Sequence, residues 1–194
     1  MGPLALQLEE RFTYGDYVTW VDEERWELID GIPYNMSPAP RVAHQRILGE
    51  MYLQFGNWLK GKPCQVFIAP FDVRLPDAEE PDALVETVVK PDLLVICDKR
   101  KLDEAGCRGA PDLVVEILSP ATAQKDLKIK FARYERAGVR EYWIVDPVGK
   151  TAQVFARGSD GHYGRPQVFV DGDQARIGIL PELVIDLAAV FADL

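Results

Sequence analysis

One glutamate stands inside an otherwise apolar run, Leu113-Val114-Val115-Glu116-Ile117-Leu118. Such a run is typical of a central strand that is buried on both faces. Because burial of an unpaired carboxylate is unfavourable, Glu116 must have a partner, and a cation would satisfy that need. Asp112 lies on the same face of the strand, but about 13 Å further along it. We interpret Asp112 as structural.

A second acid, Asp92, follows Pro91 at the start of another apolar run, Val88 to Asp98. This context is also typical of a turn residue. If the two runs form neighbouring strands, Asp92 and Glu116 repel each other unless positive charge lies between them. Carboxylate ligands suit Mg²⁺ or Mn²⁺, whereas the two histidines lack the spacing of a zinc ligand pair. The sequence therefore predicts a divalent-metal site held by Asp92 and Glu116.

The helix predicted over Thr122 to Ala137 offers a lysine to this site. At about 100° per residue, Leu127 and Tyr134 belong to the core-facing side, and Lys130 lies roughly 60° from Leu127. Lys130 can therefore reach inward. Lys128, about 100° from Leu127 on the other margin, is the second choice, and Lys125 points nearly opposite.

The stretch from Thr122 to Arg140 carries six bases against two acids, which makes it a basic helix in an acidic chain. Its alternative interpretation is a solvated helix face. The whole chain has a net charge of -9, which argues against a protein whose entire surface binds nucleic acid.

The order of predicted elements indicates an α/β fold, a mixed sheet flanked by helices. We expect a hairpin with its turn at Asp30-Gly31, a helix over Val42 to Lys60, strands over Cys64 to Leu75, Val88 to Asp98, Ala110 to Ser119 and Glu141 to Pro147, and a helical tail in LVIDLAAVFADL. A length of 194 residues predicts one domain, 1–194, with its core at about 26–147.

Composition and cysteine usage predict an ordinary globular protein. Of the residues, 47% are hydrophobic and 27% charged, which excludes a disordered or fibrous chain. The three cysteines lack C-x-x-C spacing, so a reduced, cytoplasmic protein is expected. We find no export signal or membrane span in the sequence and expect no membrane partner.

Several motifs in order resemble the Uma2 family (DUF820) of restriction-type endonucleases. They are KPDLLVICD, GAPDLVVEILSPAT, the D-x-x-x-K-x-x-x-Y spacing of Asp126, Lys130 and Tyr134, and AGVREYWIVDP, together with WELIDGIPY and SPAPRVAHQ. The family is assigned to the PD-(D/E)xK nuclease superfamily, so the resemblance implies a restriction endonuclease-like core of helix, three strands, helix and strand with an N-terminal hairpin extension. The superfamily lysine falls at Leu118 here, and the resemblance implies that Lys130 takes its place.

By this resemblance the protein is a Mg²⁺- or Mn²⁺-dependent endonuclease acting on DNA. Asp92 and Glu116 would hold the metal, and Lys130 would orient the attacking water or stabilise negative charge. Glu27 matches a glutamate of the family and is a further catalytic candidate; otherwise it is one polar position on a half-exposed hairpin. His44 matches a family histidine or is simply a polar residue at a helix start.

Two other functions stay open at this stage. One is a catalytically silent nucleic-acid- or protein-binding module on the same fold, for which the charge of -9 and the displaced lysine speak. The other is hydrolysis of RNA or of another phosphate ester. We expect a homodimer, since cutting both strands of a duplex with one site per chain favours two-fold symmetry.

Overall fold

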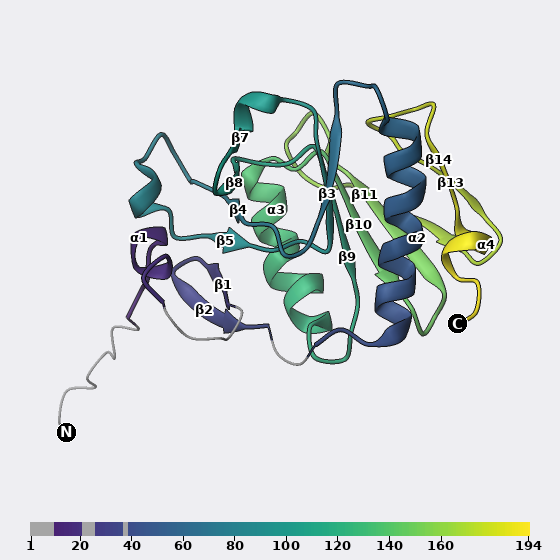
Figure 1. The fold of residues 1–194 in the computed structure, drawn as a ribbon, viewed down its shortest axis with the longest axis horizontal. Helices are drawn as coiled ribbons and strands as arrows, with labels where there is room; N and C mark the ends of the chain where they lie inside the picture. The colour runs from purple at the N-terminus through teal and green to yellow at the C-terminus, as the bar shows by residue number, and fades with distance from the viewer. Residues whose placement is uncertain (1–9, 21–25, 37–38) are drawn as a thin grey trace.

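A mixed sheet forms the centre of the molecule in the computed structural model, which describes residues 10–20, 26–36 and 39–194 (Figure 1). Its strand order is β12-β11-β10-β9-β6-β3. Helix α2 covers one face and α3 lies on the other. The bounds are α2 Val42–Leu59, β3 Gln65–Ile68, β6 Leu93–Ile96, β9 Leu113–Ile117, α3 Phe131–Ala137, β10 Glu141–Asp146, β11 Thr151–Ala156 and β12 Gln167–Val170. The order α2, β3, β6, β9, α3, β10 confirms the predicted α/β core.

The strands of this sheet run in both directions. β9 and β10 are parallel, as expected for two strands joined by a helical crossover, while β3, β6 and β9 are antiparallel neighbours. Every residue of β6 and β9 is buried, which confirms that both are central strands covered on two faces.

A second sheet, in the order β2-β1-β5-β4-β8-β7, holds the N-terminal hairpin. Its bounds are β1 Trp26–Ile29, β2 Ile32–Asn35, β4 Val73–Arg74, β5 Val88–Val89, β7 Leu102–Asp103 and β8 Gly106–Arg108. Asp30 and Gly31 both have positive φ, 50° and 77°, which is the backbone that a tight two-residue hairpin turn requires. The predicted hairpin is confirmed.

Two of the predicted strands are divided between the two sheets. The strand expected over Cys64 to Leu75 separates into β3 and β4, and the strand expected over Val88 to Asp98 separates into β5 and β6. Pro70 and Pro91 lie at the two breaks, where a residue without an N–H cannot continue a strand ladder. The second division leaves Asp92 directly before β6.

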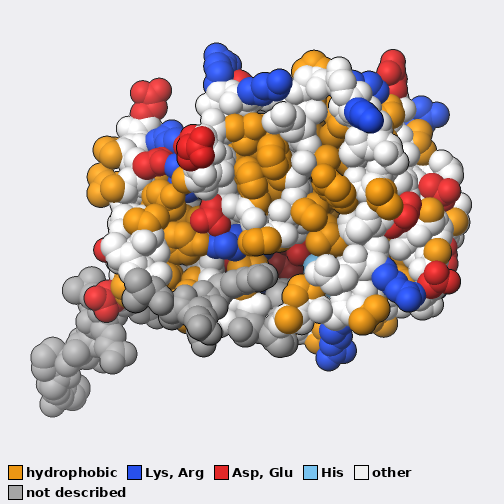
Figure 2. Space-filling view, in the orientation of Figure 1, with side chains coloured by type: hydrophobic (Ala, Val, Ile, Leu, Met, Phe, Trp, Pro, Cys, Tyr) orange, Lys and Arg blue, Asp and Glu red, His pale blue; other side chains and the backbone are white. Residues whose placement is uncertain are grey.

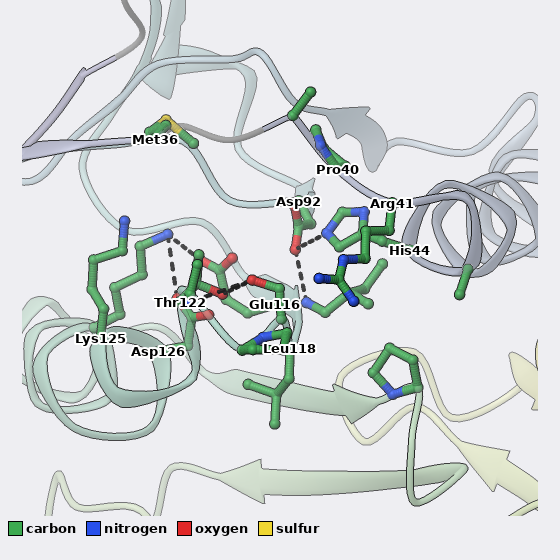
Figure 3. Close-up of a pocket in the computed structure, with 18 of the residues that line it drawn as sticks. Met36, Pro40, Arg41, His44, Asp92, Glu116, Leu118, Thr122, Lys125 and Asp126 are labelled. Carbon is green, nitrogen blue, oxygen red and sulfur yellow. Dashed lines mark hydrogen bonds and ion pairs between the residues drawn. The ribbon is translucent and has the colours of Figure 1, made fainter.

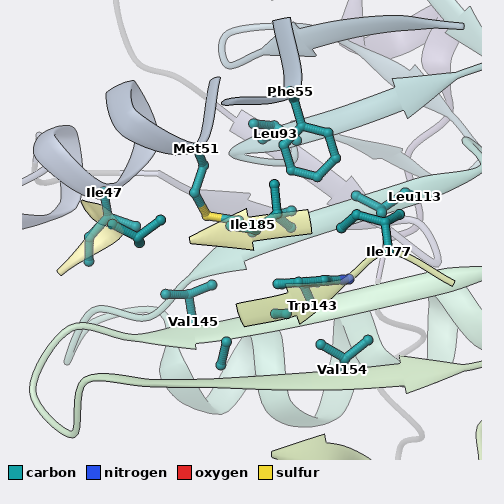
Figure 4. Packing of buried hydrophobic residues seen from close by; sticks show 14 of the residues in the cluster. Ile47, Met51, Phe55, Leu93, Leu113, Trp143, Val145, Val154, Ile177 and Ile185 are labelled. Atoms are coloured by element: carbon teal, nitrogen blue, oxygen red, sulfur yellow. The ribbon is translucent and has the colours of Figure 1, made fainter. Parts of the chain in front are cut away.

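Hydrophobic side chains fill both sides of the central sheet. On the α2 side, Met51 and Phe55 pack against Leu93, Leu113 and Trp143 (Figure 4). The same cluster extends to the C-terminal elements β13 Gln174–Arg176, β14 Val184–Asp186 and α4 Leu187–Val190. The prediction of a helical tail is wrong in its first part: β14 pairs with β13, and the short helix α4 begins only after Asp186, whose side chain caps it.

Side-chain alternation along β9 decides where Glu116 points. Val115 and Ile117 belong to the cluster under α2, whereas Val114 belongs to the cluster on the α3 side. Glu116 shares the parity of Val114, so its carboxylate faces α3.

The remaining elements are short. They comprise α1 Tyr14–Tyr17, two 3-10 turns, Asp82–Leu84 and Lys99–Lys101, and a π-helical turn, Lys125–Lys130. No helix within the described residues is both long and apolar enough to cross a membrane.

The expectation of reduced cysteines is wrong for one pair. The register of β3 against β6 pairs Gln65 with Ile96 and so sets Cys64 opposite Cys97, and these two cysteines form a disulfide. Cys107 is free and buried.

Candidate active site

Asp92 and Glu116 face each other across neighbouring strands. The register of β6 against β9 pairs Leu93 with Val115, and its continuation by one residue sets Asp92 opposite Glu116. Directly opposed residues of an antiparallel pair point to the same face of the sheet. The predicted meeting of the two acids is therefore present in the structure.

Both acids line a cavity of about 330 Å³ at this end of the sheet (Figure 3). The start of α2 and the segment after β9 form its other walls. In the space-filling view, acidic and histidine side chains lie recessed between hydrophobic side chains near the lower edge of the described surface (Figure 2). Of the two acids, Asp92 has 18% of its side-chain surface exposed, whereas Glu116 has only 4%.

Two groups hold the Asp92 carboxylate. Its Oδ2 accepts the main-chain N–H of Ile117 at 2.7 Å and lies 3.1 Å from Nε2 of His44. His44, in the first turn of α2, is only 8% exposed. The structure thus makes His44 a partner of Asp92 rather than a surface residue at a helix start, and only the family resemblance signalled this in the sequence.

Glu116 is almost fully buried and accepts two hydrogen bonds on one oxygen. Lys130 Nζ donates to Oε1 at 2.9 Å, and the Tyr134 hydroxyl donates to the same atom at 2.7 Å. Burial raises the pKa of Glu116 to about 8. The charge of Lys130 acts to lower this pKa, and the charges of Asp126 and Asp92 add to the rise.

Lys130 connects Glu116 to a second buried acid. Its ammonium lies 2.7 Å from Glu27 Oε1, 2.9 Å from Glu116 Oε1 and 3.8 Å from Asp126 Oδ1. Burial alone would lower the pKa of Lys130, but the three carboxylates outweigh it and raise the pKa well above its ordinary value. Lys130 therefore reaches the acids as predicted and stays charged; its role in catalysis stays a prediction.

Glu27 is fully buried, so its interpretation as a polar position on a half-exposed hairpin is wrong. Its Oε2 lies 2.5 Å from Lys125 Nζ, and its Oε1 accepts the main-chain N–H of Lys90 at 2.9 Å. Burial acts to raise the pKa of Glu27, but Lys130 and Lys125 outweigh it, and the pKa is lowered. β1 thus adds an ionised carboxylate to the site.

The helix after β9 begins with a wide turn that an ordinary helical wheel does not describe. Residues Lys125–Lys130 form a π-helical turn, which leads directly into α3. It buries both Asp126 and Lys130 but leaves Leu127 43% exposed. The expected core position of Leu127 is therefore wrong, because a π-turn holds more residues than an α-turn and rotates those before it.

The same rotation reverses the expected roles of two lysines. Lys125, expected to point away from the core, reaches Glu27, whereas Lys128, the second choice for the site, lies on the exposed side of the turn. Sequence reasoning missed Lys125 because the 100° spacing of an α-helix was applied through a π-turn.

Most bases of the basic stretch are paired with acids, although Lys128, Arg136 and Arg140 remain exposed. Beyond the two lysines that meet Glu27, Arg133 pairs with Asp77, Arg136 with Asp30, and Arg140 with Asp112. Acids from distant segments thus compensate most of its positive charge. Asp112 also accepts the N–H of Cys97, in agreement with its structural interpretation.

The charge balance of the cluster fits a divalent cation. Four acids, Glu27, Asp92, Glu116 and Asp126, surround two ammonium groups, those of Lys125 and Lys130. When all are ionised this leaves an excess of two negative charges, and a divalent cation would favour the ionised form of Glu116, whose pKa of about 8 otherwise keeps it largely protonated near pH 7.

The carboxylate oxygen atoms of Asp92 and Glu116 are also available to bind a divalent cation. Within the described residues, the hydrogen bonds and ion pairs of Asp92 fall on Oδ2 and those of Glu116 on Oε1, so each acid keeps a second oxygen for another ligand. No ready-made group of three or more metal-binding side chains is found in the described part of the chain. Mg²⁺ needs only one or two carboxylates, since water and substrate phosphate complete its shell.

Comparison with known proteins places this geometry in a family. The profile of the Uma2 family, described as "Putative restriction endonuclease", matches residues 14–188. An uncharacterized protein from Synechocystis is 25% identical over 151 residues, which cover 76% of this chain and 75% of that protein. The crystal structure of a "putative nuclease belonging to DUF820" from Anabaena variabilis superimposes with a TM-score of 0.74 at 19% identity, over 93% of this chain and 98% of the other, and shows the same fold. The acids Asp92 and Glu116 and the buried Lys130 thus lie within the matched region, and the chain belongs to the Uma2 family.

Proposed function

We propose that this protein is a divalent-metal-dependent endonuclease that hydrolyses phosphodiester bonds in DNA. The observation that carries the proposal is the pair of opposed carboxylates, Asp92 and Glu116, which open on a cavity and have the buried ammonium of Lys130 beside them. The description of the Uma2 family supports the same reaction class.

In this proposal Asp92 and Glu116 hold Mg²⁺ or Mn²⁺. The bound ion polarises a phosphate and lowers the pKa of water. His44 and the Ile117 N–H fix the orientation of Asp92, while Tyr134 and Lys130 fix that of Glu116. Lys130, which keeps its proton, supplies a positive charge where negative charge builds up on the phosphate. Glu27 acts through Lys130 by holding its ammonium in place.

Cleavage of supercoiled plasmid is the direct test. We expect conversion of the plasmid with Mg²⁺ or Mn²⁺ and none with EDTA. Asp92→Asn and Glu116→Gln keep the shape of each side chain and remove the charge, so both should abolish conversion while the protein stays folded. Wild-type rates in the Glu116→Gln variant would rule out this proposal.

A second candidate is a catalytically silent binding module. It is favoured by the engagement of Glu116 Oε1 with both Lys130 and Tyr134, which leaves one of its oxygen atoms for a metal. Calorimetric titration of Mn²⁺ into wild type and Asp92→Asn separates the two. Heat of binding that depends on Asp92 supports the nuclease, and its absence in the wild type supports the silent module.

A further inference from the structure

Arg41 stands apart from the other cations of the active-site cavity. It precedes the first residue of α2, is exposed, and lines the cavity next to His44 (Figure 3). Among the described residues Arg41 has no acidic partner. The ammonium groups that line the same cavity are all paired: Lys90 with Asp72 at 2.9 Å, Lys125 with Glu27, and Lys130 with Glu27 and Glu116.

We infer that Arg41 binds a phosphate of the polynucleotide backbone at the mouth of this cavity, an inference that rests on the proposed function. A guanidinium presents parallel N–H donors that match two phosphate oxygens, and it stays charged at any pH of interest. The scissile phosphate must approach Asp92 and Glu116, which are acidic, so a cation at the entrance has to offset their repulsion. Among the described residues that line the cavity, Arg41 is the cation without an acidic partner, so its charge can offset this repulsion.

The surroundings of Arg41 suit an anion. No side chain caps the start of α2, so main-chain N–H groups of its first turn lie beside Arg41 at the positive end of an 18-residue helix. His44, which also lines the cavity, has a buried Nδ1 without a hydrogen-bond partner among the described residues. A phosphate oxygen can accept hydrogen bonds from these main-chain N–H groups and from the Arg41 guanidinium, whereas Nδ1 of the neutral His44 ring, whose Nε2 donates to Asp92, is an acceptor and does not contribute.

The number of phosphate contacts follows from the charges elsewhere. The bases of the segment 122–140 are largely paired with acids, the chain carries a net charge of -9, and blue and red side chains are interspersed over the visible face (Figure 2). Arg41 therefore provides the phosphate contact of the cavity itself, and its loss should remove the salt dependence of one contact.

Binding is measured by fluorescence anisotropy with a fluorescein-labelled DNA duplex in EDTA, across a series of NaCl concentrations. Arg41→Ala should weaken binding about tenfold or more, and its plot of log affinity against log salt should be shallower by about 0.9, the value for one lost phosphate contact. Arg41→Lys should restore the slope but only part of the affinity, because an ammonium lacks the planar fork.

Arg165→Ala is the matched control. Arg165 is also exposed but does not line the cavity, so its loss should leave affinity and salt slope at wild-type values. Unchanged affinity and slope in Arg41→Ala would overturn the inference, as would a wild type that does not bind the duplex. A wild type that binds through Arg41 but cuts no DNA with Mg²⁺ or Mn²⁺ would instead refute the proposed nuclease and leave the inference standing.

Discussion

Four carboxylates and two ammonium groups share one cluster, so the charge of each side chain affects the pKa values of its neighbours. Lys130 is the central member, because its ammonium contacts Glu27 and Glu116 and lies near Asp126. Removal of one partner from such a cluster leaves an uncompensated buried charge, which costs far more than the loss of an exposed pair.

Replacement of Lys130 should therefore damage both stability and activity. We expect Lys130→Met to lower the free energy of unfolding by about 3–5 kcal/mol, because Glu27 and Glu116 lose their shared cation. Urea unfolding measures this effect, and plasmid cleavage measures the loss of activity. The control is Lys128→Met on the exposed side of the same turn, which should change the free energy of unfolding by less than about 0.5 kcal/mol. Equal effects of the two substitutions would contradict the assignment.

The raised pKa of Glu116 predicts a pH dependence of stability in the metal-free protein. Glu116 has a pKa of about 8 when folded and an ordinary value of 4.5, so the folded state binds the extra proton between these pH values. Stability from this group is complete below pH 4.5 and is lost as the pH rises through about 8. Urea unfolding in EDTA should show this fall.

Glu116→Gln provides the comparison, because glutamine does not ionise. The variant should have a flatter pH profile over the same window. The slope that remains comes from other acids such as Asp126 and Glu141, whose pKa values are also raised by burial. Glu27 has a lowered pKa and therefore acts only at more acidic pH. Parallel profiles for wild type and variant would show that Glu116 is ionised throughout.

Single residues differ in how far the sequence could predict them. Glu116 was predictable because a carboxylate in an apolar run has few explanations, and Asp92 followed from the adjacency of two strands. The contact of Glu27 with Lys125 was not predictable, since these residues are 98 positions apart and no local pattern indicates their contact.

The π-helical turn Lys125–Lys130 is the element that decides which lysines face inward. Both Lys125 and Lys130 reach Glu27, although they are five residues apart. In a π-turn the repeating hydrogen bond also spans five residues, which brings such side chains to the same side. The wide turn is therefore what allows one carboxylate to hold two ammonium groups.

Lengthening this turn should separate the two lysines. Insertion of one alanine after Lys128 sets Lys125 and Lys130 six residues apart, which places them on different sides of an α-helical or π-helical turn. The insertion should therefore take Lys125 away from Glu27 and lower the free energy of unfolding by about 3 kcal/mol or more, as for a broken buried pair. Lys128→Ala keeps the length of the turn and should behave as wild type in urea unfolding and plasmid cleavage. Equal stability of the insertion and the substitution would show that the turn length is unimportant.

The elements themselves were largely predictable. The hairpin, α2, β9 and β10 appear where hydrophobic periodicity and turn residues indicate them. Long apolar stretches hid the strand breaks at Pro70 and Pro91, because apolar character does not tell which of two sheets a strand joins. The π-turn was not predictable, since its sequence fits an α-helical wheel equally well.

At the scale of the whole molecule, the net charge of -9 limits how the proposed DNA substrate can be held. A symmetric pair of chains would present two sites to the two strands of a duplex, and this is the basis of the proposed homodimer. One chain carries one such site, so cutting of both strands at one position would require two chains.

Light scattering coupled to size-exclusion chromatography tests the dimer. We expect a mass of twice 21.8 kDa, with no change upon Arg41→Ala, which lies at the cavity. On plasmid substrate a dimer should produce linear DNA early, whereas a monomer should accumulate nicked circles first. A mass of 21.8 kDa together with nicked circles would rule out paired cutting.

The position of Glu27 far from Lys130 in the sequence matters while the chain is being synthesised. The members of the cluster lie between positions 27 and 130, on a hairpin, two strands and a helix that meet only after folding. A partly synthesised chain that ends before Lys130 keeps both Glu27 and Glu116 without their common cation. The proposed site would therefore be complete only after synthesis has passed Lys130, so shorter products of translation would lack the proposed cutting activity.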